Sequence, residues 1–363
     1  MTPSATVQSM NASLVFDMVT ALSTNDPGVA IAALRSIVVL GKEYPSNLLF
    51  EELVDRMLSV EAIAYEDAVS IYASLVFVYD KASTCSCDLE FPHQWEPLAN
   101  ALQDASVLPK TDERWRRLLL VVQFFVYCFL KDFDVCRDRY EKDDGPEWLY
   151  HTRLFTLLHT GDAGTSLSGR TTKRATANRL KIHNNLILQA IGAGLALWQR
   201  VYDPLQSESR TSVNNHGDTV DSTLEAKETC VAIVRLIEML YMCTDQVQNI
   251  LGRLQAGLLE LSRETRAVFA QTLELPDLQT QLATTVLGLT NKSRSKEHEW
   301  YECNAMGRIL QSINSQTTSL TASDGAATDG YSWSHFDSLV TSSAKNDFTR
   351  LLQDIVRLQK EDS

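Results

Sequence analysis

Apolar residues recur at helical spacing along most of the chain. The stripe in residues 5–22, for example, runs through Val7, Met10, Leu14, Met18 and Leu22, which is the spacing of one face of an amphipathic helix. Runs of alternating apolar and polar residues, which would indicate strands, are few. The same pattern predicts further helices over residues 28–42, 47–60, 65–80, 94–104, 111–131, 147–159, 177–202, 277–291, 295–316 and 345–359. We therefore predict an all-α fold, either a multi-helix bundle or a degenerate array of helical hairpins.

The longest apolar pattern covers about residues 222–275, which we predict to form a long central helix. Two rows of residues seven apart, one starting at Ile233 and the other at Cys230, make one continuous stripe. The flanking positions are also apolar, which favours a bundle interior over a two-stranded coiled coil. Thr244-Asp245 is a capping signal in the middle of this pattern. If the long helix is divided in two, we expect the break at this point. Self-association through this helix is compatible with the pattern but not required by it.

Three polar stretches divide the helical regions: residues 161–176, 203–221 and 317–332. They suggest an N-terminal helical region over 1–160 and a flexible basic loop over 161–176. A C-terminal bundle with the long helix follows over 177–316. A low-complexity linker over 317–332 and an amphipathic helix within 333–363 complete the prediction.

Charge and cysteine content narrow the class of protein. With 46 acidic and 33 basic side chains, the net charge is −13. A general nucleic-acid binder needs a basic surface, and this composition therefore argues against that class of protein. Seven cysteines, four of them within apolar helical patterns, favour reduced thiols in an intracellular protein, cytoplasmic or nuclear. We expect no signal peptide and no membrane span, since the apolar run 118–130 is too short to cross a bilayer.

Asp143-Asp144-Gly145-Pro146-Glu147 contains the spacing DDxxE. It is similar to the first metal motif of class I terpene synthases, which implies Mg²⁺ bound by Asp143, Asp144 and Glu147 and a prenyl diphosphate as substrate. The glycine and proline inside the motif depart from that pattern, because carboxylates projecting together from a helix end need an uninterrupted helix. The other interpretation is a turn that leads into the helix after Pro146.

Other motifs carry less information. Cys85-Ser86-Cys87 with His93 is part of a zinc-ligand set, but a structural zinc site needs four ligands at wider spacing. Gly192-Ala193-Gly194 lies inside a predicted helix, where small residues favour close helix packing over a dinucleotide site. No nucleophile is paired with a base by its neighbours, and no cofactor is predicted.

Between Ala163 and Tyr202 the chain has no acidic residue. A basic segment here comprises Arg170, Lys173, Arg174, Thr176, Arg179 and Lys181. Lys173 and Arg174 precede Thr176 at the spacing that basophilic kinases accept, so phosphorylation at a helix start is one interpretation. In this interpretation the basic segment makes a regulated contact with an acidic partner or an anion. The alternative is that it pairs with the acidic stretch 132–147 of the same chain.

These observations support three functional hypotheses. The first is an all-helical protein-interaction protein, an adaptor, scaffold or regulatory subunit whose partners are other proteins. The second is a magnesium-dependent enzyme acting on a prenyl diphosphate through Asp143, Asp144 and Glu147. The third is a nuclear factor that contacts nucleic acid through residues 170–181, although the acidic composition makes nucleic acid the less expected partner. We favour the first, because helix faces dominate the sequence and no catalytic constellation emerges.

Overall fold

The computed structural model describes residues 8–23, 27–41, 43–84, 89–160, 185–202, 219–244 and 246–287. Its N-terminal part contains β1 (Gln8–Ser9), α1 (Ala12–Ser23), α2 (Pro27–Ser36), the π-helical turn η1 (Ile37–Gly41), β2 (Glu43–Tyr44), α3 (Asn47–Leu58) and α4 (Tyr65–Thr84). Next come α5 (Glu96–Val107), α6 (Glu113–Asp144), the 3₁₀ helix η2 (Gly145–His151), α7 (Arg153–Thr160) and a helix over 185–202. The last described elements are α9 (Thr219–Met242), α10 (Val247–Leu259), α11 (Arg263–Thr272) and α12 (Pro276–Leu287).

The predicted all-α fold is confirmed. Among the described residues, strand pairing is confined to β1 and β2, which lie parallel over two residues each, with Gln8 opposite Glu43. Contacts divide the chain into two compact units, Met1–Ile250 and Leu251–Ser363. The domain boundaries predicted from the sequence stay a prediction. None of the described helices is both long and apolar enough to cross a membrane.

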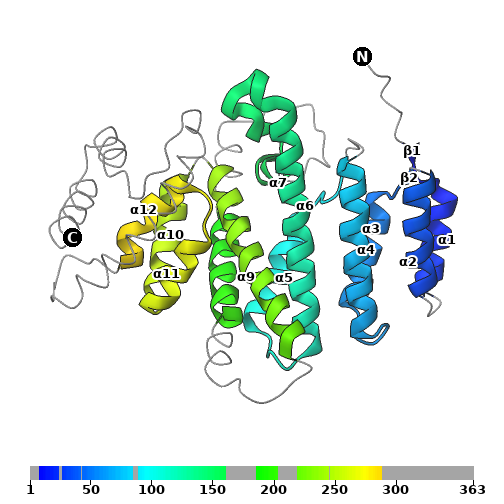
Figure 1. Cartoon of the computed structure of the whole chain (residues 1–363), viewed down its shortest axis with the longest axis horizontal. Helices are drawn as coiled ribbons and strands as arrows, with labels where there is room; N and C mark the ends of the chain where they lie inside the picture. The colour runs from blue at the N-terminus through cyan, green and yellow to red at the C-terminus, as the bar shows by residue number, and fades with distance from the viewer. Residues whose placement is uncertain are drawn as a thin grey trace, which may run out of the picture. The chain divides into compact units, whose positions relative to one another are not determined.

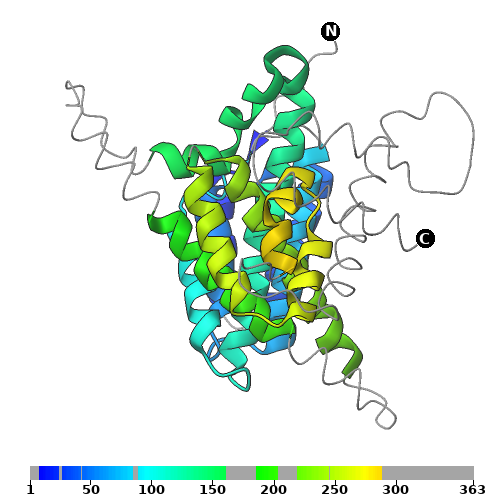
Figure 2. The same ribbon diagram turned by 90° about the vertical axis from the view of Figure 1, so that its left-hand side faces the viewer.

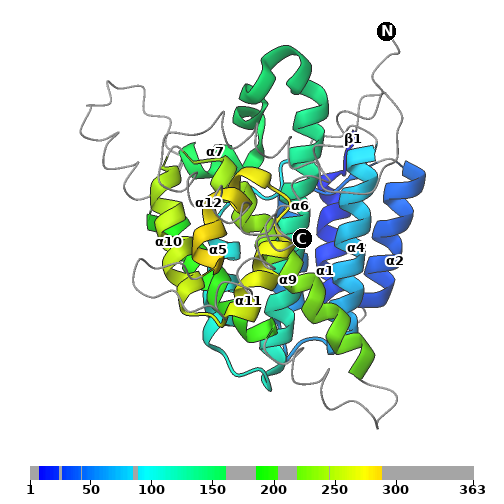
Figure 3. The same ribbon diagram turned by 60° about the vertical axis from the view of Figure 1, so that its left-hand side comes forward.

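Helix α6 is the centre of the first unit. It packs against α3, α4, α5, α7 and α9, and Figure 1 shows it between α4 and the α5–α9 pair. Seen from the side, the long helices α4 and α6 lie roughly along one axis (Figure 2). In Figure 3, α2 lies beside α4 on the flank that faces away from α6.

The apolar run in α6 explains this position. Residues 118–126 are all buried, including Phe124 and Phe125, so the membrane-like run predicted to lie in a core does so. Asp112 lies directly before the helix and accepts a hydrogen bond from the backbone N–H of Arg114 at 2.9 Å, which satisfies one of the donors at the helix start. Both faces of α6 are covered because a helix that is apolar all round must be surrounded.

The predicted end of this helix at residue 131 is wrong. Helix α6 continues through the charge-dense stretch to Asp144. Phe133 and Cys136 are buried, while Asp134 and Arg137, the residues that follow each of them, are exposed and form an ion pair at 2.7 Å. The apolar residues thus keep helical spacing beneath the charges, and this spacing rather than the charge density sets the secondary structure.

The long central helix predicted over about 222–275, with a possible break near Thr244, is divided into more than one helix. The segment folds as α9, α10 and α11, with breaks at residues 243–246 and 260–262. The first break lies where the capping signal was noted, and Thr244 Oγ1 accepts from the backbone N–H of Gln246 at 3.1 Å. Ser262 caps α11 by accepting from the N–H of Thr265. Local capping therefore overrides a continuous apolar stripe.

Arg117 connects α6 to the end of α3. Its side chain is fully buried and donates to the carbonyl oxygens of Met57 at 3.1 Å, Ser59 at 3.2 Å and Ile63 at 2.7 Å. Its Nε donates to the Glu113 carboxylate at 3.0 Å. The carbonyls that end a helix lack partners within the helix and carry partial negative charge, so a guanidinium satisfies them well.

The same arrangement recurs at other helix ends. Arg200, from the helix over 185–202, donates to the carbonyls of Ser106 and Leu108 at the end of α5. In the second unit, Arg266 of α11 donates to the Thr285 carbonyl near the end of α12 at 3.1 Å. Gln279 of α12 in turn donates to the Leu273 carbonyl beyond α11 at 2.7 Å. Helix packing and helix capping are thereby performed by the same side chains.

A buried polar pair joins α6 to α9. Gln123 Nε2 donates to Thr229 Oγ1 at 2.7 Å, and both side chains are buried. Gln123 is the polar residue that interrupts the apolar run of α6, and this hydrogen bond fixes which part of α9 it meets. A second contact with α9 comes from Gly194 in the helix over 185–202. A Cβ added to Gly194 would lie 3.4 Å from the Ile233 Cγ2, which agrees with the close helix packing predicted at this glycine.

We predict that replacing Arg117 with Ala lowers the free energy of unfolding by about 3 kcal/mol or more, because three buried carbonyls lose their donor. Urea unfolding followed by circular dichroism measures the change. The matched control is Arg114→Ala, which removes a half-exposed arginine paired with Asp104 at 3.4 Å and should cost less than about 1 kcal/mol. Equal losses in the two variants would contradict the role given to Arg117.

The link between α6 and α9 is tested by a double-mutant cycle. Gln123→Leu and Thr229→Val should each lower the free energy of unfolding by about 1–3 kcal/mol, since each leaves a buried partner without its hydrogen bond. The double variant should lose less than the sum by about 1 kcal/mol. Strictly additive losses would show that the two side chains do not interact.

Candidate functional sites

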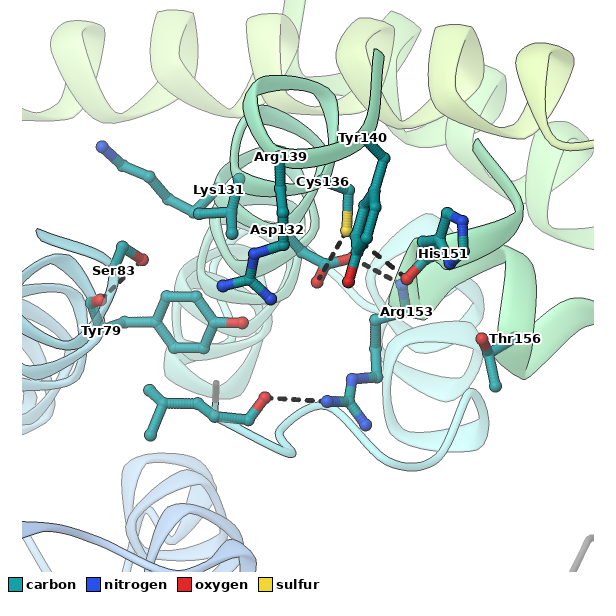
Figure 4. A pocket seen from close by; sticks show the side chains of 12 residues that line it. Tyr79, Ser83, Lys131, Asp132, Cys136, Arg139, Tyr140, His151, Arg153 and Thr156 are labelled. Carbon is teal, nitrogen blue, oxygen red and sulfur yellow. Dashed lines mark hydrogen bonds between the residues drawn. The ribbon is translucent and has the colours of Figure 1, made fainter. Parts of the chain in front are cut away.

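A polar pocket lies between α4, α6 and α7 (Figure 4). Its volume is about 290 Å³. The wall on α6 consists of side chains one turn apart, among them Asp132, Cys136, Arg139 and Tyr140, which the helix repeat brings to one side. The rest of the lining consists of Tyr79 and Ser83 of α4, together with Leu89, Lys131, Val135, His151, Arg153 and Thr156.

Asp132 organises the inner wall. Its Oδ2 accepts from the backbone N–H of Arg153, the first residue of α7, at 2.5 Å. This carboxylate thus occupies the positive end of the α7 dipole. The Cys136 Sγ is 4.0 Å from Asp132 Oδ1 and 3.4 Å from the His151 carbonyl oxygen, toward which the thiol donates. These bonds hold η2 and α7 against α6.

Aromatic side chains form two further walls. The rings of Tyr140 and His151 stack with centroids 4.0 Å apart. The Tyr79 hydroxyl donates to the Phe91 carbonyl at 3.0 Å, and burial raises the pKa of Tyr79 well above its usual value. Tyr79 is therefore a neutral hydrogen-bonding group over the accessible pH range, without the character of a base.

Cationic side chains outnumber carboxylates around the pocket. Lys131, Arg139 and Arg153 line it, against the carboxylate of Asp132 alone. Lys131 also pairs with Asp80 at 3.1 Å, and this contact lowers the pKa of Asp80. The Arg153 guanidinium donates to the Leu89 carbonyl at 2.9 Å. Such a wall is suited to an anion rather than to a metal ion.

The residues of the DDxxE motif lie beyond this pocket. Asp143 and Asp144 end α6, and Glu147 is exposed in η2. In the described part of the chain no group of three or more histidine, cysteine or acidic side chains could hold a metal ion. Magnesium binding by Asp143, Asp144 and Glu147 stays a prediction.

The remaining candidates from the sequence fall mostly elsewhere. Cys85 and Cys87 lie outside the described residues, and so does the whole basic segment with Arg170, Lys173, Arg174, Thr176, Arg179 and Lys181. His93 is described, and its Nε2 is 3.1 Å from Glu51 Oε1 beside a second cavity of about 280 Å³. That pairing gives His93 an acidic neighbour on α3.

A second candidate is an apolar surface on α2 and η1, which we call the α2 face. Val29, Ala32, Ala33 and Ser36 are exposed on α2 together with the charged Arg35, and η1 continues the surface with Val39 and Leu40. Val29 is 63% exposed and Leu40 is 83% exposed, although side chains of this kind normally contribute to cores. The opposite side of the helix, with Leu34 2% exposed, packs in the unit.

No protein-family model, curated protein or solved structure matches this chain.

The polar pocket was missed by sequence reasoning, and so was the exposure of the α2 face, although a helix was predicted over residues 28–42. Asp132 and Arg139 belong to the charge-dense stretch 132–147, in which neighbouring acidic and basic residues give no sign of which side chains line a pocket. The spacing of 132, 136, 139 and 140 follows a helix repeat and could have placed them on one side, had α6 been extended beyond residue 131. Arg153 joins them through the turn at η2, which no periodicity predicts.

Four of the described cysteines are buried thiols that are not joined in disulfides: Cys128, Cys136, Cys230 and Cys243. Burial raises the pKa of Cys230 and of Cys243 to about 12. Since the thiolate is the reactive form, these two side chains have little nucleophilic character in the folded protein.

We expect iodoacetamide at pH 8 to label Cys230 and Cys243 at least about 100-fold more slowly in the folded chain than in urea, where a thiol has a pKa near 8.5. Peptide mapping by mass spectrometry gives the rate at each site. Folded-state rates within a few-fold of the unfolded rates would contradict the burial of these thiols.

Proposed function

We propose that this chain is a protein-interaction protein, an adaptor, scaffold or regulatory subunit, and that the α2 face is its contact surface. The observation that carries the proposal is the exposure of Val29 and Leu40 on one helical rod whose opposite side is packed. Contiguous apolar surface on a helix is typical of sites that receive a partner. The spacing of Val29, Ala33, Ser36 and Leu40 is that of a helix stripe.

The partner that fits best is an amphipathic helix with basic residues beside its apolar face. Small residues at Ala32, Ala33 and Ser36 allow another helix to approach the α2 backbone closely. The first 84 residues contain ten acidic and four basic side chains, a net charge of −6. This surplus favours a basic partner and disfavours a second copy of the chain, which would bring the same negative charge.

The α9 segment is less suited to the same task. Ile233, Val234, Ile237 and Leu240 are all at most 1% exposed, and α9 packs on α6. These side chains are already used in the core of the first unit. Self-association through residues 222–275 stays a prediction, and the α2 face carries the proposal.

A fluorescent synthetic helix with leucines at the heptad a and d positions and lysines elsewhere tests the surface. We expect the full chain to bind it with a dissociation constant of about 10 μM or tighter, measured by anisotropy. Val29→Glu with Leu40→Glu should weaken binding at least about tenfold, because carboxylates would be buried under the partner's apolar face. The matched control is Val107→Glu on α5, which alters a residue that is 72% exposed and should change affinity less than about twofold.

Several outcomes would contradict the proposal. Equal binding by the α2 face variant and the Val107 control would indicate non-specific attraction to an acidic protein. A large loss of stability in the α2 face variant would show that the chain covers this face itself. A dimer that light scattering detects in the parent and not in the variant would assign the face to a second copy. Cellular partners should be lost in affinity purification with the α2 face variant and retained with Val107→Glu.

A further inference from the structure

We propose that the pocket between α4, α6 and α7 binds a small phosphate-bearing molecule with a hydroxyl-rich body, of the size of a sugar phosphate. This inference is independent of the α2 face. It depends on the charge of the lining, on the geometry of its arginines and on the size and polarity of the cavity.

The charge of the lining is opposite to that of the chain. Arg139 and Arg153 lie here against the carboxylate of Asp132, whereas the charge of Lys131 is balanced by Asp80 at 3.1 Å and the whole protein carries a net charge of −13. Asp132 is engaged with the N-terminus of α7 through the Arg153 backbone N–H at 2.5 Å. The carboxylate thus serves the fold, and its charge is offset by the helix dipole as well as by the neighbouring cations. The surplus of positive charge makes the cavity favourable for an anion.

The two arginines come from different elements and face the cavity from different sides. In Figure 4 the Arg139 guanidinium extends from α6 toward Tyr79, whereas that of Arg153 lies farther from Tyr79. The Arg153 Nη2 donates to the Leu89 carbonyl at 2.9 Å. Because a guanidinium has five N–H donors in a planar fork, it can bind a wall carbonyl and a phosphate oxygen together.

The size and polarity of the cavity define the rest of the ligand. A volume of about 290 Å³ is at the lower limit of small-molecule sites. Hydroxyl groups of Ser83, Tyr140 and Thr156 line it. Those of Ser83 and Thr156 donate to the carbonyls of Tyr79 and Thr152 at 3.0 Å each, and their oxygens can accept hydrogen bonds from ligand hydroxyls. A body with several hydroxyls matches this lining better than an apolar chain such as a prenyl group. The phosphate would lie toward the arginines.

Isothermal titration calorimetry of the full chain with glucose 6-phosphate, glucose and inorganic phosphate tests the proposal. We expect glucose 6-phosphate to bind with a dissociation constant of about 1 mM or tighter, and more weakly as salt is raised. Glucose alone should give no binding up to about 10 mM, since the charge contacts are then missing. Arg139→Gln should weaken binding by about 10- to 100-fold, the usual effect of losing a charge-assisted pair.

The matched control is Arg137→Gln, two residues earlier on the same helix. Arg137 is exposed, pairs with Asp134 at 2.7 Å and lies outside the pocket lining, so its removal changes the protein's net charge equally. The affinity of the Arg137→Gln variant for glucose 6-phosphate should stay within about twofold of that of the parent chain. Absence of glucose 6-phosphate binding, or equal weakening by the two variants, would overturn the proposal. Equal affinity for inorganic phosphate would overturn the inferred hydroxyl-rich body.

Discussion

The burial of the Arg117 guanidinium is the constraint on which the first unit depends. A charge taken fully out of water is costly unless each of its donors is matched. Here the partners are the carbonyls of Met57, Ser59 and Ile63, all from the end of α3 and the connection to α4, together with the Glu113 carboxylate. The position of α6 against α3 and α4 is therefore fixed by a polar requirement, and the surrounding apolar packing then follows.

The same logic explains how a chain of many short helices is held together. Arg200 acts at the end of α5, and Arg266 and Gln279 act at helix ends in the second unit. The last carbonyls of a helix need partners that the helix cannot provide. A long side chain from a neighbouring helix satisfies them and simultaneously positions that neighbour. Apolar burial supplies the driving force, whereas these contacts determine which helices pair.

Local signals in the sequence predicted the fold class and most helices, because helical spacing of apolar residues and capping residues are both local. Asp112 is such a local signal, because it caps the helix that begins at the next residue. The run 222–275 could not be resolved in the same way, since a stripe remains in register across a break that Thr244 and Ser262 create by capping. Hydrogen-bond partners such as Arg117 and Ile63 are 54 residues apart. Their pairing produces no periodic pattern in the sequence from which it could be predicted.

The two candidate surfaces differ in how far the sequence could reveal them. The α2 face looks like any other amphipathic helix until its exposure is known, and exposure is a property of the packed unit. The pocket requires α6, η2 and α7 to fold back on one another, which brings Arg139 and Arg153 to one cavity. Both surfaces lie on elements that the α6 core positions, so their geometry depends on that core.

Native-state hydrogen exchange of the full chain, followed by mass spectrometry, tests this dependence most directly. Amides of residues 118–129 in α6 should exchange slowest, through global unfolding alone, because they lie at the centre of the buried core. In Arg117→Ala, exchange should accelerate across residues 57–63 as well as in α6. Exchange in 118–129 as fast as in α1 and α2, or a variant in which 57–63 keep their protection, would contradict the account.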